Sequence, residues 1–125
     1  MTLLEECIQA LGNSYEVFDD IRSLKLFDSF QDDFPFTSWG RIDWDQIENK
    51  QKIQNISQIS NLFDSEECYI FWDEESLPVV KVSIEGVLNS IDDVTAVSFD
   101  TWILSTTNIC VVEFFHEGEI MIGYR

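Results

Sequence analysis

The sequence predicts an α+β (mixed α/β) fold in which N-terminal helices pack on a largely antiparallel C-terminal sheet. In the first half of the chain, apolar residues recur at the three-to-four-residue spacing of amphipathic helices. In the second half, short apolar or alternating runs are separated by polar turns, which is typical of antiparallel strands. The chain has 125 residues, so we expect residues 1–125 to form a single domain.

The first helix is predicted over residues 3–11. Thr2 and Glu5 have the spacing of a capping box, and Gly12 supplies a stop after the last periodic apolar residue. A short strand is expected over residues 15–18.

A second helix is predicted to begin behind Asp19 or Asp20 and to end near Phe34, because the residue before Pro35 avoids the helical region. Its expected apolar face consists of Ile21, Leu24, Phe27 and Phe30. Residues 36–52 resemble a loop or a short strand. A third helix is then expected from Ile53 to Phe63, before the acids at 64–67.

The second half of the chain is predicted to be rich in strands. Residues 68–72 form a continuous apolar run, as in a strand covered on both faces, and residues 80–84 alternate like a half-buried strand. A short helix is expected over 84–91, followed by a loop at Asp92 and Asp93. The remaining predicted strands span residues 95–104, 109–115 and 119–124, with a tight turn at Glu117-Gly118 before the last.

The charge of the chain is extreme and is spread along its length. There are 24 acidic and 7 basic residues, and the formal net charge is −17. Residues 1–65 hold 12 acids and 5 bases, and residues 66–125 hold 12 acids and 2 bases, so the excess is not confined to a tail. A negative surface of this kind repels nucleic acid and anionic membranes and speeds encounter with basic partners. We therefore expect a basic protein partner, no nucleic acid and no membrane, although acidity that serves solubility alone remains an alternative.

No motif for catalysis or cofactor binding is present. The three cysteines, Cys7, Cys68 and Cys110, lie far apart in apolar runs, so we expect buried, reduced thiols and no metal site. His116 is the only histidine and has no nucleophile motif to serve. Close carboxylate pairs are unavoidable among 24 acids, and phosphate-binding glycine motifs are absent. The sequence thus predicts a binding protein that is not an enzyme and has no cofactor.

Acidic clusters beside aromatic residues are the best candidates for a partner-binding surface. High affinity depends on a few desolvated anchors ringed by polar groups, and aromatic residues are common anchors. The tryptophans Trp39, Trp72 and Trp102 are further candidates, although core packing is the simpler role for each tryptophan, above all for Trp72 within its apolar run. We predict that the interface draws on Asp43, Trp44, Asp45, Asp73, Glu74, Glu75, Asp92, Asp93, Asp100 and Glu117.

Four stretches of the chain resemble a known group of bacterial proteins. They are Trp39-Gly40-Arg41-Ile42-Asp43-Trp44, Leu77-Pro78-Val79-Val80-Lys81, the segment Val94 to Trp102, and the segment Val112 to Ile120. In order and spacing they are similar to immunity proteins of polymorphic toxin systems, including contact-dependent growth inhibition.

This resemblance implies a cytoplasmic antidote that binds and neutralises a cognate toxin, often a nuclease with a basic substrate-binding face. The start of the chain, which lacks a basic region and a long apolar stretch, agrees with a cytoplasmic location. Occlusion of the toxin's active site and binding beside it both remain open. The alternatives are an acidic interaction module or nucleic-acid mimic with another basic partner, and an enzyme that uses clustered carboxylates and a metal.

Overall fold

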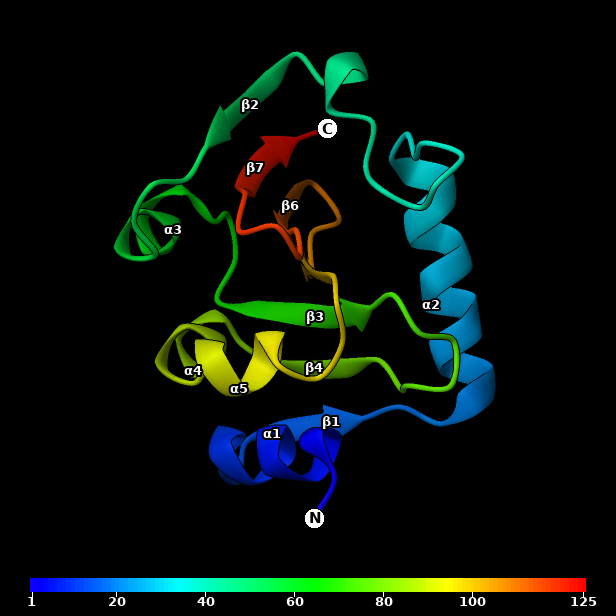
Figure 1. Cartoon of the computed structure of the whole chain (residues 1–125), viewed down its shortest axis with the longest axis vertical. Coiled ribbons are helices and arrows are strands. Elements are labelled where there is room, and N and C mark those ends of the chain that lie inside the picture. The colour runs from blue at the N-terminus through cyan, green and yellow to red at the C-terminus, as the bar shows by residue number, and fades with distance from the viewer.

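The fold, described for residues 1–125 in a computed structural model, is a seven-stranded antiparallel sheet covered by helices on both faces (Figure 1). This confirms the predicted α+β class. The strands are β1 (Tyr15–Val17), β2 (Asn49–Lys52), β3 (Glu67–Trp72), β4 (Val80–Ser83), β5 (Thr101–Ser105), β6 (Cys110–Phe114) and β7 (Ile120–Tyr124). They lie in the order β1-β4-β3-β5-β6-β7-β2, and the two edge strands, β1 and β2, are the ones whose residues are all exposed.

Four short helices cover one face of the sheet. They are α1 (Leu3–Leu11), α3 (Ser57–Leu62), α4 (Ile84–Asn89) and α5 (Ile91–Thr95). α1 has the predicted capping box: the Thr2 hydroxyl accepts from the Glu5 amide at 3.0 Å, and the Glu5 carboxylate accepts from the Thr2 amide at 3.1 Å. Beneath these helices lies the larger core, formed by 19 buried apolar residues, which include all three cysteines.

The opposite face of the sheet is covered by α2 (Asp20–Asp33) and by the segment that follows it. Asp19 caps this helix through the Arg22 amide at 2.8 Å. Phe30 is stacked on Phe71 of β3, with ring centroids 4.8 Å apart, and Phe27 meets Trp102 of β5 edge-on. The second core on this face is therefore mainly aromatic.

The structure corrects the predicted apolar face of the second helix. Phe27 and Phe30 pack on the sheet, whereas Ile21 and Leu24 are exposed. The N-terminal turns of this helix lie beside the β3–β4 turn, at the side of the sheet (Figure 1), where the groove between them is open to solvent. Two apolar side chains are thus left in solvent.

Two further boundaries differ from the prediction. Ile53 does not begin a helix, since its amide donates to the Ile120 carbonyl at 2.8 Å and continues the pairing of β2 with β7. The segment predicted as a loop at 92–93 and a strand from 95 is instead α5, followed by a loop as far as Asp100. Burial of Val94 and the hydrogen bond from Thr95 Oγ1 to the Ile91 carbonyl at 2.8 Å stabilise this helical turn.

Candidate functional site

An acidic groove lies between α2 and the turn that joins β3 to β4, on the side of the aromatic core. These two segments lie side by side in Figure 1. Its volume is about 860 Å³. Five of its 15 lining residues are acids, and none is Lys or Arg; the acids are Asp20, Asp28, Asp73, Glu75 and Asp100. Because both walls carry the same sign, the groove concentrates the negative potential of the chain.

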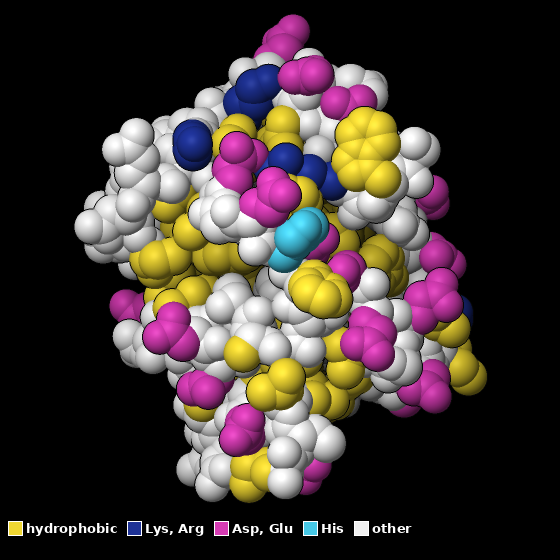
Figure 2. All heavy atoms as spheres, in the orientation of Figure 1, with side chains coloured by type: hydrophobic (Ala, Val, Ile, Leu, Met, Phe, Trp, Pro, Cys, Tyr) yellow, Lys and Arg dark blue, Asp and Glu magenta, His cyan; other side chains and the backbone are white.

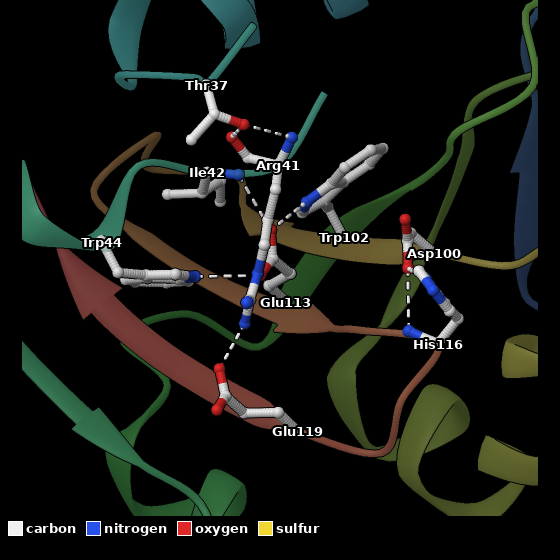
Figure 3. Close-up of polar contacts among 9 residues, drawn as sticks. All are labelled: Thr37, Arg41, Ile42, Trp44, Asp100, Trp102, Glu113, His116 and Glu119. Carbon is white, nitrogen blue, oxygen red and sulfur yellow. Dashed lines mark hydrogen bonds and ion pairs between the residues drawn. The ribbon is translucent and has the colours of Figure 1, made fainter. Parts of the chain in front are cut away.

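Two of these acids are fixed by hydrogen bonds at the end of the groove where β3 and β5 meet. Asp73 Oδ1 accepts from the Ser98 hydroxyl at 2.6 Å and from the Asp100 amide at 3.2 Å. Asp100 Oδ1 in turn accepts from the His116 amide at 2.8 Å and lies 3.0 Å from His116 Nδ1 (Figure 3). The two carboxylates are therefore held in place by backbone and side-chain donors.

Two exposed aromatic side chains accompany these acids. Trp39 lines the groove and is 77% exposed. Phe99 is 79% exposed, and its ring lies 6.0 Å from that of His116. The single histidine, cyan in Figure 2, lies near the middle of the pictured face, with acidic and apolar side chains around it. Aromatic side chains held in solvent beside charged groups are typical of binding surfaces.

Trp39 is presented by a narrow loop at residues 35–43. The Thr37 amide donates to the Arg41 carbonyl at 2.7 Å, and the Asp43 amide donates to the Pro35 carbonyl at 2.8 Å. Gly40 follows the tryptophan with φ of +87°, a backbone conformation that disfavours any residue with a side chain. Gly40 thus allows the tight turn at which Trp39 lies.

The base of this loop is held by Glu113 of β6, whose side chain is 1% exposed. Its carboxylate accepts four hydrogen bonds (Figure 3): from Arg41 Nε at 2.6 Å, from the Ile42 amide at 2.9 Å, from Trp44 Nε1 at 2.9 Å and from Trp102 Nε1 at 3.0 Å. A buried carboxylate is tolerated when it is paired and fully hydrogen-bonded, as here.

Arg41 completes the network at its solvent side. Its guanidinium also pairs with Glu119, and it lies over the ring of Phe115 at 4.0 Å from the centroid. Burial works to lower the pKa of Arg41, but the hydrogen bonds to Glu113 and Glu119 outweigh it and raise the pKa above its usual value. The arginine is therefore a permanent charge within the protein.

Comparison with models of protein families shows to which family the chain belongs. The model described as CdiI immunity protein, EcoliA0-like, matches residues 1–123. The chain belongs to the CdiI immunity protein family. A comparison with individually curated proteins found no match. Members of this family neutralise toxins of contact-dependent growth inhibition by binding them, so the family implies a toxin partner and an inhibitory role.

This CdiI protein brings together part of the predicted interface. Asp73, Glu75 and Asp100 line the acidic groove, and Glu74 lies in the same turn, where its carboxylate accepts from the Ser76 hydroxyl at 3.1 Å. Glu117 is exposed in the β6–β7 turn, directly after His116. These five predicted residues lie around one end of β3 and β5.

The other predicted residues lie elsewhere. Asp43 precedes the 3-10 helix η1 (Trp44–Gln46), which contains Asp45, whereas Asp92 and Asp93 form the first turn of α5, across the sheet from the groove. The Trp44 side chain is buried and donates to Glu113, so it is not an exposed anchor in CdiI.

Sequence reasoning missed the contribution of α2 to the groove. Asp20, Leu24 and Asp28 line it, yet in sequence they resemble the ordinary polar and apolar positions of an amphipathic helix. Only the excess of apolar positions on the N-terminal half of this helix could have indicated an exposed face.

Two further observations concern metal binding and membrane insertion. No three His, Cys, Asp or Glu side chains converge in a way that could hold a metal ion. None of the helices has the length and apolar character needed to cross a bilayer.

Proposed function

We propose that this CdiI protein neutralises a nuclease toxin domain in the cytoplasm by covering its basic substrate-binding face with the acidic groove. The observation that carries the proposal is the lining of the groove: five carboxylates with no Lys or Arg, in a chain of net charge −17. Family membership supplies the toxin as partner. The nuclease chemistry, the mode of inhibition and the absence of turnover by CdiI itself are parts of the proposal.

Electrostatics favours such a partner. A nuclease binds phosphates through Arg and Lys side chains, and carboxylates are the protein groups that pair with the same cations. Complementary potentials raise the association rate, and they steer the basic face toward the groove before contact is made. An acidic groove thereby competes directly with nucleic acid.

Charge alone does not hold a complex together, and α2 supplies apolar contact area beside the groove. Ile21 and Leu24 are both exposed, and Leu24 lines the groove between Asp20 and Asp28. Apolar anchors surrounded by polar groups carry most of the binding energy in protein interfaces. The α2 side of the groove has this composition.

A matched pair of charge variants tests the location. Asp28→Asn with Glu75→Gln removes two groove charges whose side chains make no hydrogen bond within the protein. Asp92→Asn with Asp93→Asn removes two charges from α5, on the other face of the sheet. With the cognate toxin domain, the groove pair should slow association roughly threefold to tenfold, and the α5 pair much less. Equal slowing by both pairs would place the interface elsewhere.

The nuclease part of the proposal has its own test. The purified toxin domain should cleave nucleic acid, and one equivalent of CdiI should abolish both cleavage and the binding of a labelled oligonucleotide. A complex that has lost cleavage but still binds the oligonucleotide would show inhibition from outside the substrate-binding face. A toxin without nuclease activity would overturn the proposed chemistry.

A further inference from the structure

Trp39 differs from the other three tryptophans in its surroundings. Trp44, Trp72 and Trp102 are at most 9% exposed, and each donates its indole N–H to a partner within the protein. Trp39 is 77% exposed and has no such partner. It also lines the acidic groove, so most of a large aromatic side chain is open to a ligand beside carboxylates.

The loop that carries Trp39 is held by backbone hydrogen bonds from its base to its tip. In addition to the pairing of Thr37 with Arg41, the Gly40 amide donates to the Thr37 carbonyl at 3.1 Å, and Phe36 and Ile42 form a β-bridge. A rigid loop loses little conformational entropy when its tip residue is immobilised by a partner. The exposed ring is therefore presented in a preformed position.

Glu113 connects this loop to the sheet. It binds the backbone of Ile42 and the side chains of Arg41 and Trp44, all of which lie at or after the base of the loop. A buried ion pair often adds no more stability than apolar residues of similar volume, so stability alone does not require a carboxylate here. Its directional hydrogen bonds do, however, fix the position of the base of the loop on the sheet.

We propose that Trp39 receives an Arg or Lys side chain of the toxin on its indole face, and that Glu113 is the positioning residue that holds Trp39 for this contact. The cation would lie between the ring and the groove carboxylates and would gain from both. The inference rests on the proposed function in that it takes the toxin surface to be basic, but it does not require the toxin to be a nuclease.

Two substitutions of Trp39 test the nature of the contact. Trp39→Phe keeps an aromatic face, whereas Trp39→Leu keeps an apolar side chain but removes the aromatic face. The dissociation rate from the separately purified toxin domain should rise only a few-fold for Trp39→Phe and about tenfold or more for Trp39→Leu. Equal rates for the two variants would overturn the cation contact.

Two glycines test the loop geometry without touching the core. Gly40 and Gly12 have φ of +87° and +83°, and a Cβ added at either one meets no atom within 4 Å. Gly40→Ala and Gly12→Ala therefore introduce similar backbone strain, one beside Trp39 and one at the end of α1. Gly40→Ala should raise the dissociation rate several-fold and Gly12→Ala should not. Equal effects would contradict a preformed loop.

A double-mutant cycle tests the role of Glu113. Glu113→Gln should raise the dissociation rate when Trp39 is present and have little further effect in a Trp39→Leu background. A merely structural role would weaken binding equally in both. Should Glu113→Gln fail to fold, Arg41→Lys takes its place in the same cycle, since it keeps the charge and loses the fork geometry.

The same measurements separate this inference from the proposed function. If the groove pair Asp28→Asn with Glu75→Gln slows association but Trp39→Leu dissociates like the wild type, the acidic groove stands and the Trp39 contact falls. If Trp39→Leu dissociates fast while neither charge pair affects association, the contact stands and the groove proposal falls.

Discussion

Glu113 and Arg41 form an ion pair of 2.6 Å although they are 72 positions apart in the sequence. The strand register explains how the pair forms on the groove side. Glu113 lies opposite Trp102 of β5 and opposite Met121 of β7, so its side chain points toward the aromatic core. The loop after α2 crosses this face and delivers Arg41 to it. One acid of β6 thus joins the loop that carries Trp39 to Trp102 of β5.

Removal of the Glu113 carboxylate should destabilise the protein strongly. Glu113→Leu removes one of the two carboxylates that pair with Arg41 and leaves two indole N–H groups without an acceptor. Breaking one side of a buried pair removes about 3–5 kcal/mol. Urea unfolding at neutral pH measures the change. Glu117→Gln, an exposed neighbour in the next turn, should stay within about 0.5 kcal/mol of the wild type. Similar midpoints for both variants would contradict the network's role.

Gly123 of β7 should tolerate no side chain, because Trp44 packs directly on it. A Cβ built at Gly123 would lie 2.7 Å from Cζ3 of Trp44 and 3.3 Å from Cγ2 of Ile47. We expect Gly123→Ala to reduce the free energy of unfolding by about 1–3 kcal/mol through overpacking. The penalty should shrink in a Trp44→Leu background, since the shorter side chain makes room. If Gly123→Ala costs as much free energy of unfolding in the Trp44→Leu background, the clash is with a residue other than Trp44.

The buried thiols should make the protein less stable in alkaline solution. Burial, with a smaller effect from Asp93, raises the pKa of Cys7 from 9.0 to about 11. Burial, with Asp64 nearby, raises that of Cys110 to about 12. Above pH 9 the unfolded chain therefore releases thiol protons that the folded chain retains, and the free energy of unfolding falls as pH rises from 9 to 11. Urea midpoints across this range measure it, and the Cys7→Ala variant should show a shallower fall.

Thiol labelling gives an independent check of the same burial. All three cysteines are free and buried, and thiolate is the reactive form. At pH 8 the folded protein should react with a thiol reagent far more slowly than the urea-unfolded chain, in which three equivalents should react at once. Rapid labelling of a cysteine in the folded protein would show that its surroundings open readily.

Local sequence signals predicted most of the elements in which neighbours along the chain decide the structure. The capping box of Thr2 and Glu5, the alternation from Val80 to Val82 and the Glu117-Gly118 turn all appear where expected. The loop from Ala96 to Asp100, by contrast, was predicted as part of a strand. Its apolar residues resemble a strand, but Asp73 captures the Asp100 amide, and the chain begins to pair only at Thr101. A contact between residues 27 positions apart leaves no local trace.

The candidate site was predictable in part for the same reason. Runs of acids such as Asp73 to Glu75 indicate an exposed turn, and the structure places that turn at the groove. The exposure of Leu24 and the burial of Trp44 depend instead on where α2 lies relative to the β3–β4 turn and on which strand lies under η1. Neither is encoded by spacing within one segment, so the opposite wall of the groove appears only in the folded chain.

Whether the acidic groove attracts a basic face is tested most directly by the association rate constant between this immunity protein and its toxin domain as ionic strength rises from about 20 mM to about 300 mM. Screening lengths shorten over this range, so attraction between an acidic groove and a basic face weakens. The wild-type rate should fall steeply, and the rate of the Asp28→Asn, Glu75→Gln variant should fall clearly less. A wild-type rate that does not change with salt would contradict this attraction.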